Sequence, residues 1–368
     1  MESKNLIGIR TLLLLLIVSS ALFVSSCKKS DSSTPVVVDR AALTKTLASA
    51  DSLSTAAATT DYDQADITAY KATLATAKTA STASTLTQAQ VNSLVIQIKA
   101  AMALLNSKAF GFIDETLYLV AGWKFDEGTG TTATSYSTAK QVGTFMKGFT
   151  TLLGANAALP TWVDGVKGGK AIHLNNGAHL EVPYSPSFLP ASISISAWIK
   201  MDKTNWENNI IVSQNYWKGY KFQTQDHSYP MFTEGLTPTT ASDQDAGEAV
   251  VKDVWTQIAV SLTSKGDSMQ LFINGVLVKT VISGTSGIGP LTQNLAFVDV
   301  AAGYTYTAQP FLIGSLATDA ELAAKPLNFN WITTANVASF EGSIDNLKIF
   351  NTALKPGQIK KLYNDEKP

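Results

Sequence analysis

The sequence contains almost no cysteine and little charge. Cys27 is the only cysteine among 368 residues, so no disulfide can form within the chain and a folded domain must be held by its hydrophobic core. Charged residues make up 15% of the chain and the formal net charge is −1, so the composition offers no basic surface for nucleic acid. Hydrophobic residues make up 45%, as is typical of a folded globular protein.

The sequence also lacks the motifs of common catalytic sites. It has no G-x-S-x-G motif, no glycine-rich phosphate loop and no Glu-x-Asp-x-x-Glu run, which would place two carboxylates at glycosidase spacing. Asp243, Asp245 and Glu248 lie in a polar stretch that we interpret as a loop with solvated charges. We therefore expect a protein that is not an enzyme. His173, His179 and His227 are not at metal-ligand spacing, and we interpret His173 and His179, which lie in expected strands, as satisfied or surface residues.

Glycine and proline are missing from residues 36–108, where alanine, threonine and serine dominate. Glycine is frequent from Gly111 onward, and prolines recur from Pro160. Helices avoid both residues in their interiors, whereas sheet proteins need them at turns. The boundary between a helical part and a β part is therefore expected near residues 108–116.

The helical part shows three apolar stripes at helical spacing, separated by short polar breaks. Thr87 and Gln90 form a capping box that would start the third helix. Short connections place helices antiparallel, so a three-helix bundle is expected over residues 39–108. This segment resembles the FIVAR module of bacterial surface proteins, and we interpret it as a spacer, with ligand binding as the alternative. The stripes contain Leu43, Leu47, Ala50 and Ser54, then Ile67, Tyr70, Leu74 and Ala77, then Val91, Leu94, Ile98, Met102 and Leu105.

The N-terminus has the order of regions found in export signals. Lys4 and Arg10 precede an apolar run over residues 12–24, and small residues then lead to Cys27. A run of about 13 residues is shorter than the roughly 20 that a membrane-spanning helix needs. A signal peptide over residues 1–26 and a polar, flexible linker over residues 27–38 are therefore expected.

Residues 22–27 resemble the lipobox of bacterial lipoproteins, in which the cysteine becomes the lipidated first residue. Val24 and Ser26 depart from the commonest pattern, which has leucine and then glycine or alanine at these positions. The resemblance implies a lipid on Cys27, and the alternative is an ordinary cleaved signal with a chance cysteine. Lys28 after the cysteine favours the outer membrane by analogy with lipoprotein sorting. The expected location is the cell envelope, in the outer membrane and at the cell surface.

In the β part, apolar residues recur at every second position. Ile193, Ile195, Ala197 and Ile199 alternate with polar residues and Trp198, which predicts a strand with one face on a core. The pair at positions 274–275, Asn-Gly, lies between two apolar runs and predicts a β-hairpin. Many short strands with turn signals indicate an antiparallel sandwich, and about 250 residues suit a jelly roll. Further strands are expected at 171–174, 179–182, 210–214, 219–224, 257–262, 311–313 and 342–350.

Residues 117–366 resemble a laminin-G-like, concanavalin A-like jelly-roll domain, of the kind found in lectins and glucanases. The resemblance implies a mainly β fold. It rests on several short sequence pieces that occur in the same order as in the family. These pieces are Gly-Trp-Lys-Phe-Asp-Glu-Gly at 122–128, Gly-Lys-Ala-Ile-His-Leu-Asn-Asn-Gly at 169–177, Ser-Ile-Ser-Ala-Trp-Ile at 194–199, Trp-Thr-Gln-Ile-Ala-Val at 255–260, Leu-Phe-Ile-Asn-Gly at 271–275 and Phe-Glu-Gly-Ser-Ile-Asp-Asn-Leu-Lys-Ile-Phe-Asn at 340–351.

The same resemblance implies one calcium ion near the closing strand. Asp345 matches the family's metal-binding aspartate, whereas the second aspartate that the family often has is missing around Ser135. Calcium takes six to eight oxygen ligands, so the loss of a carboxylate weakens the expected site. The alternative for Asp345 is a turn or edge residue bonded to the backbone.

Aromatic and amide residues gather in the polar stretches of the β part. Aromatic rings stack on the apolar faces of sugars, while amides satisfy the hydroxyl groups, so we predict carbohydrate binding. The alternative is that these rings pack beneath loops, and a protein-adhesion or structural module is the rival function, with a glycoside hydrolase less favoured. Trp123, Trp198 and Trp255 are expected in or beside the core. The predicted ligand-binding residues are Trp206, Asn215, Tyr216, Trp217, Tyr229, Tyr304 and Tyr306.

Overall fold

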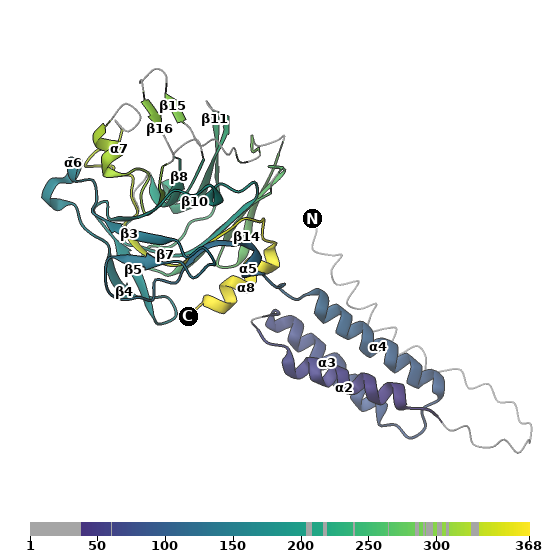
Figure 1. Ribbon diagram of the computed structural model, residues 1–368. Coiled ribbons are helices and arrows are strands. Elements are labelled where there is room, and N and C mark those ends of the chain that lie inside the picture. Colours follow the sequence, from purple (N-terminus) through teal and green to yellow (C-terminus); the bar gives the residue numbers. More distant parts are fainter. Residues whose placement is uncertain are drawn as a thin grey trace, which may run out of the picture.

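The computed structural model shows three helices beside a β-sandwich (Figure 1). None of the helices in the described part of the chain is long and apolar enough to cross a membrane. The predicted signal peptide and Cys27 lie outside the described residues, as do the side chains of Asp226, residues 297–299, residues 304–306 and Ala324. The structure describes residues 38–59, 61–203, 208–215, 219–237, 240–263, 265–283, 287–289, 291, 297–299, 304–306, 309–324 and 331–368.

The three predicted N-terminal helices are present as α2 (Ala41–Ala56), α3 (Gln64–Ser81) and α4 (Gln88–Ser107). The capping box of α4 forms as predicted, because the Thr87 side chain accepts from the Gln90 N–H and the Gln90 side chain accepts from the Thr87 N–H. Their core is small, and the hydroxyl of Tyr70 donates to the Ala50 carbonyl across it at 2.9 Å. A spacer role for these helices stays a prediction.

Two antiparallel sheets form the sandwich, which confirms the predicted concanavalin A-like fold class. Sheet A has the order β14 (Val276–Ile282), β13 (Ser268–Ile273), β12 (Thr256–Leu262), β7 (Ile193–Met201), β18 (Gly342–Phe350), β5 (Lys170–Leu174) and β4 (Thr161–Asp164), and β1 (Leu119–Trp123) also pairs with β18. Sheet B has the order β11 (Thr240–Asp245), β10 (Tyr229–Thr237), β9 (Tyr220–Gln225), β8 (Asn209–Gln214), β17 (Phe311–Ile313), β6 (His179–Val182), β3 (Val142–Met146) and β2 (Thr132–Thr134). A separate pair is β15 (Phe297–Asp299) with β16 (Tyr304–Tyr306).

The hydrophobic core fills the space between the sheets. Trp123 is fully buried there, and its ring stacks on Phe311 at 6.0 Å, while Phe188 stacks on Phe311 at 4.4 Å. Such contacts give the sandwich a single core without any disulfide. The predicted hairpin joins β13 to β14, where Asn274 and Gly275 have φ of 50° and 71°.

The outer face of sheet A is also buried, which corrects the expectation that β7 packs on one side only. Helix α8 (Pro356–Glu366) lies across this face (Figure 1). Trp198 is 1% exposed because its ring stacks on Tyr363 of α8 and its indole N–H donates to Glu366. Trp123 and Trp198 are therefore buried as predicted, and Trp255 is half-buried.

The acidic stretch after residue 240 was wrongly interpreted as a loop. Asp243 and Asp245 lie in β11, the edge strand of sheet B. The strand shows no alternation of apolar residues because it has one neighbour only and buries little of either face. Glu248 lies beyond the strand and is exposed.

Candidate functional site

Polar side chains form a row across the outer face of sheet B. The pairing register places Ser213, Lys221, Thr233 and Asp243 side by side on four successive strands. Ser213 and Thr233 are fully buried, and Lys221 is 2% exposed. Burying polar groups costs free energy unless they are hydrogen-bonded, and the hydroxyls of Ser213 and Thr233 donate to Ser315 and Asp243. The same row continues through Leu312 to Glu181 on β6.

A cap covers the middle of this face. We use the name cap for α6 (Thr150–Leu153), α7 (Asp319–Ala324) and residues 331–338. Ile210 of β8 packs into the apolar cluster of the cap, and the Ser213 hydroxyl donates to the Ser315 carbonyl at 2.8 Å. A pocket lies on each of two sides of the cap. The apolar cluster contains Phe149, Ile210, Leu316, Ala317, Ile332 and Ala338.

The first pocket lies between the cap and strands β9 to β11, and we name it the Trp331 pocket. Its volume is about 380 Å³. Trp331 of the cap is half-buried and packs against the apolar cluster of the cap. The rest of the wall is polar apart from Met231. The lining residues are Asn208, Lys221, Gln225, Met231, Asp243, Trp331 and Asn336.

Hydrogen bonds within sheet B hold the polar wall of this pocket in place. The Thr233 hydroxyl donates to the Asp243 carboxylate, and the Gln223 amide donates to the Gln225 side chain at 3.1 Å. Asn208 enters β8 with φ of 62°, a left-handed conformation that asparagine tolerates better than most residues. The wall therefore combines an aromatic ring with amide, carboxylate and ammonium groups.

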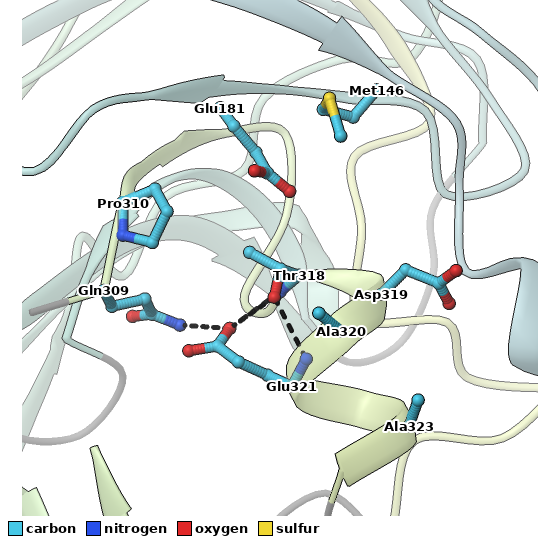
Figure 2. Close-up of a pocket in the computed structure, with 9 residues that line it drawn as sticks. All are labelled: Met146, Glu181, Gln309, Pro310, Thr318, Asp319, Ala320, Glu321 and Ala323. Carbon is cyan, nitrogen blue, oxygen red and sulfur yellow. Dashed lines mark hydrogen bonds between the residues drawn. The ribbon is translucent and has the colours of Figure 1, made fainter. Parts of the chain in front are cut away.

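The second pocket lies between α7 and strands β3 and β6, and we name it the α7 pocket (Figure 2). Its volume is about 570 Å³. Glu181 and Glu321 reach into it from opposite walls (Figure 2). Within the described part of the chain, no lysine or arginine forms an ion pair with either residue or with Asp319. The lining residues are Met146, Glu181, Gln309, Pro310, Thr318, Asp319, Ala320, Glu321 and Ala323.

Glu321 acts as a structural residue of the α7 pocket. One of its carboxylate oxygens accepts from the Thr318 N–H at 2.8 Å, from the Thr318 hydroxyl at 3.1 Å and from the Gln309 amide at 3.0 Å. This is the arrangement of a capping box at the start of a helix. Burial raises the pKa of Glu321, the hydrogen bonds oppose the rise, and the nearby Glu181 adds to it. Asp319 is likewise bound, by Thr150 and Thr151 of α6.

The predicted ligand-binding residues have different positions in the structure. Trp206, Tyr216 and Trp217 lie outside the described residues, and the side chains of Tyr304 and Tyr306 are not described. Asn215 is 5% exposed and accepts from the Gln214 amide at 3.1 Å. Tyr229 stacks on His227 at 5.5 Å, and its Cα partner in the sheet is Gln225 of the Trp331 pocket. Their role as a binding site stays a prediction.

The histidines in strands are bonded to protein groups, as expected. His173 lies 2.7 Å from the Asp202 carboxylate, and His179 is fully buried with its Nδ1 2.9 Å from the Gly177 carbonyl. The described residues contain no group of three or more His, Cys, Asp and Glu side chains that could hold a metal ion.

Asp345 is buried and bonded to the backbone, as the alternative interpretation expected. It is 1% exposed, and its two oxygens accept from the N–H groups of Val166 and Asn346 at 2.8 and 2.7 Å. Burial raises the pKa of Asp345 to about 7, the two hydrogen bonds oppose the rise, and Asp126 adds to it.

Three oxygen atoms lie close to Gly165, next to Asp345. A Cβ atom added to Gly165 would lie 2.7 Å from an Asp345 oxygen, 2.8 Å from the Lys170 carbonyl and 3.0 Å from the Gly168 carbonyl. Only glycine fits at position 165 without a clash, and a calcium ion, which takes six to eight oxygen ligands, would have to lie farther from the Gly165 backbone. These residues would hold the ion, with water in the other positions. Calcium at this place stays a prediction.

Trp331 was missed by the sequence analysis. It follows Asn328, Phe329 and Asn330 and precedes Thr333 and Thr334, so the same signal of an aromatic ring among amides and hydroxyls was present. Apart from Asn336, the other residues that line its pocket lie between positions 208 and 243. Only the fold brings these distant segments together.

Two antiparallel sheets packed face to face around a common core define a jelly-roll sandwich. The chain belongs to the concanavalin A-like lectin/glucanases superfamily, and residues 174–360 match its Laminin_G_3 family. No curated protein sequence gives a significant match.

Several solved structures are similar in fold. Domain 4 of AbnA, a GH43 extracellular arabinanase from Geobacillus stearothermophilus in complex with arabinotriose, is 18% identical with a TM-score of 0.45, covering 68% of this chain and 100% of that domain. The binding domain of Paraclostridial Mosquitocidal Protein 1 is 14% identical with a TM-score of 0.45, covering 67% of this chain and 52% of that one. The binding domain of botulinum neurotoxin DC in complex with SialylT is 12% identical with a TM-score of 0.44, covering 69% and 52%. The chain spans about half the length of these two toxin domains.

Proposed function

We propose that this protein binds carbohydrate without catalysis, and that the Trp331 pocket receives the sugar. The observation that carries the proposal is the half-buried ring of Trp331 beside Asn208, Gln225 and Asn336 in one pocket of about 380 Å³. An aromatic face suits the apolar C–H surface of a sugar, and amides can donate to and accept from its hydroxyl groups. Ligand pockets commonly combine such a surface with a few placed polar groups.

The α7 pocket supports a catalytic role less well. Retaining and inverting glycosidases need one carboxylic acid and one carboxylate free to act on the glycosidic bond. Glu321 has one oxygen already bound by three donors of its own chain. We therefore assign Glu321 to the stability of α7, and Glu181 serves as a control residue for binding.

Replacing Trp331 is expected to abolish most of the binding. For Trp331→Ala we expect at least roughly a tenfold loss of affinity, or about 1.4 kcal/mol, for a glycan that wild type retains in a glycan array or in affinity electrophoresis. Asn336→Ala, which removes one half-buried amide of the same pocket, should weaken binding with little effect on folding.

The matched control is Glu181→Gln in the α7 pocket, which should bind like wild type. Thermal unfolding of each variant shows whether the sandwich remains folded. Unchanged glycan retention by folded Trp331→Ala and Asn336→Ala proteins would exclude this pocket. If wild type retains no glycan at all, the carbohydrate proposal fails, and the protein-adhesion alternative takes its place.

We also propose that a lipid on Cys27 anchors the protein in the outer membrane, with the sandwich at the cell surface. The order of charged, apolar and small residues before the only cysteine supports this proposal. A single acyl chain holds a protein only weakly, so a lipoprotein anchor needs more than one chain.

The lipid proposal predicts that Cys27→Ser abolishes labelling by radioactive palmitate in the producing bacterium. The neighbouring variant Ser25→Ala should keep the label, since it leaves the acceptor thiol in place. The wild-type protein should appear in the outer-membrane fraction and be accessible to protease on whole cells. Labelling that persists in Cys27→Ser would contradict the proposal.

A further inference from the structure

We infer that helices α2–α4 and the β-sandwich form one rigid body, joined by a strut that is clamped against α8. We use the name strut for residues 110–115, which connect α4 to the first strand of the sandwich. Gly111 lies in it with φ of 95°, a conformation that favours glycine. Three sets of contacts, which we together name the clamp, hold the strut in place.

The first contact joins the strut to the start of α8. The backbone of Phe110 lies so close to Gly357 that a Cβ atom added to this glycine would be 2.5 Å from the Phe110 carbonyl oxygen. Gln358 of α8 then donates its amide to the Phe112 carbonyl at 2.8 Å. Phe110 itself is 6% exposed. The backbone at Phe110 and Phe112 therefore contacts the first turn of α8.

The second contact joins the helices to the same end of α8. The Lys361 ammonium lies 3.1 Å from the Asp61 carboxylate, which belongs to the turn between α2 and α3. The Asp61 carbonyl in turn accepts from the Phe110 N–H at 2.9 Å. Asp61 thus holds the strut through its backbone and α8 through its side chain. A bending motion at residues 108–110 would therefore break the ion pair with Lys361 and the hydrogen bond from Phe110.

The third contact fixes the far end of the strut in the sandwich. Ile113 packs against the apolar cluster beneath α8. Glu115 accepts from the Tyr136 hydroxyl at 3.3 Å and lies 3.5 Å from the buried ammonium of Lys348. The strut is therefore held along its length by groups on both bodies.

The clamp determines which way the pockets face. Helix α8 covers the outer face of sheet A, whereas both pockets open on the outer face of sheet B. The helices α2–α4 consequently lie on the α8 side, and the cap with α7 lies at the opposite end of the sandwich (Figure 1). A rigid clamp keeps the pocket-bearing face turned away from the helices, whatever ligand the pockets take.

The rigid-body inference can be tested by distance measurement between spin labels. We would label the full chain at Lys99→Cys of α4 and Thr132→Cys of β2, both exposed, in a Cys27→Ser background. The protein with an intact clamp should give one narrow distance distribution. Gly357→Ala, which forces a methyl group against Phe110, and Lys361→Glu, which sets two carboxylates against each other, should each broaden it at least twofold.

Two further variants make the test specific. Adding Asp61→Lys to Lys361→Glu reverses the ion pair and should restore the narrow distribution. Lys360→Glu changes the charge of α8 by the same amount as Lys361→Glu. Because Lys360 contacts the Tyr363 ring rather than helices α2–α4, this variant should leave the distance distribution narrow. A distribution that is already broad with an intact clamp, or equally narrow in all variants, would overturn the inference. Glycan retention is measured on the same proteins, so a failed clamp and a failed carbohydrate proposal give different results.

Discussion

Replacing Lys348 with methionine should destabilise the protein by about 3–5 kcal/mol, the usual cost of breaking a buried ion pair. The side chains of Lys348 and Glu366 are only 10% and 8% exposed, and their charged groups are in direct contact. Burial on its own lowers the pKa of Lys348, but the carboxylate of Glu366 raises it above its usual value, with Tyr136 and Glu115 adding to the rise. Without the ammonium, Glu366 would be a buried charge beneath Trp198 with no counterion.

The measurement is urea unfolding of wild type, Lys348→Met, Glu366→Gln and the double variant at pH 7. Each single variant should lose stability, and the double variant should lose less than the sum, because it leaves no lone charge. The control is Lys170→Met, whose pair with Asp164 is exposed and should contribute little to stability. Equal losses for Lys348→Met and Lys170→Met would contradict the assigned role of the pair.

The sequence predicted the features that depend on neighbours along the chain. The strict alternation from Ile193 to Ile199 predicted β7, the capping box at Thr87 predicted the start of α4, and Asn274-Gly275 predicted the hairpin. Each of these signals is contained within about ten residues. Local patterns alone could not decide between the possible β folds. The resemblance of several pieces, in the order found in the family, predicted the sandwich.

Features that depend on distant contacts were missed. Trp198 was expected in or beside the core, but its bond to Glu366 joins residues 168 positions apart, so no period in β7 could reveal that α8 covers its outer face. Strand β11 was missed because an edge strand needs no apolar alternation. Trp331 was missed because its pocket is completed by strands that precede it by nearly a hundred residues. The site was harder to predict than the fold because it is assembled across strands.

Stability should fall as the pH rises from about 4.5 to above 7, and Glu234 should account for a large part of the fall. Glu234 of β10 is fully buried, and it accepts from the Gly289 N–H at 3.1 Å. Burial raises the pKa of Glu234 to about 7, and that hydrogen bond only partly opposes the rise. Between pH 4.5 and 7 the folded protein holds a proton that the unfolded chain releases, so folding becomes less favourable as the pH rises.

Glu234→Gln should remove the part of this dependence that Glu234 causes, while it keeps the shape and the bond to Gly289. The part that Asp345 causes, whose pKa burial also raises to about 7, should remain in the variant. A shift from 4.5 to about 7 corresponds to roughly 3 kcal/mol above pH 7. In urea unfolding the variant should match wild type at pH 4.5 and be clearly more stable at pH 8. Glu248→Gln, at an exposed glutamate, should follow wild type at every pH. If Glu234→Gln and wild type lose stability in parallel between pH 5 and 8, the carboxyl of Glu234 ionises as freely in the folded protein as in the unfolded chain, and the assigned desolvation is wrong.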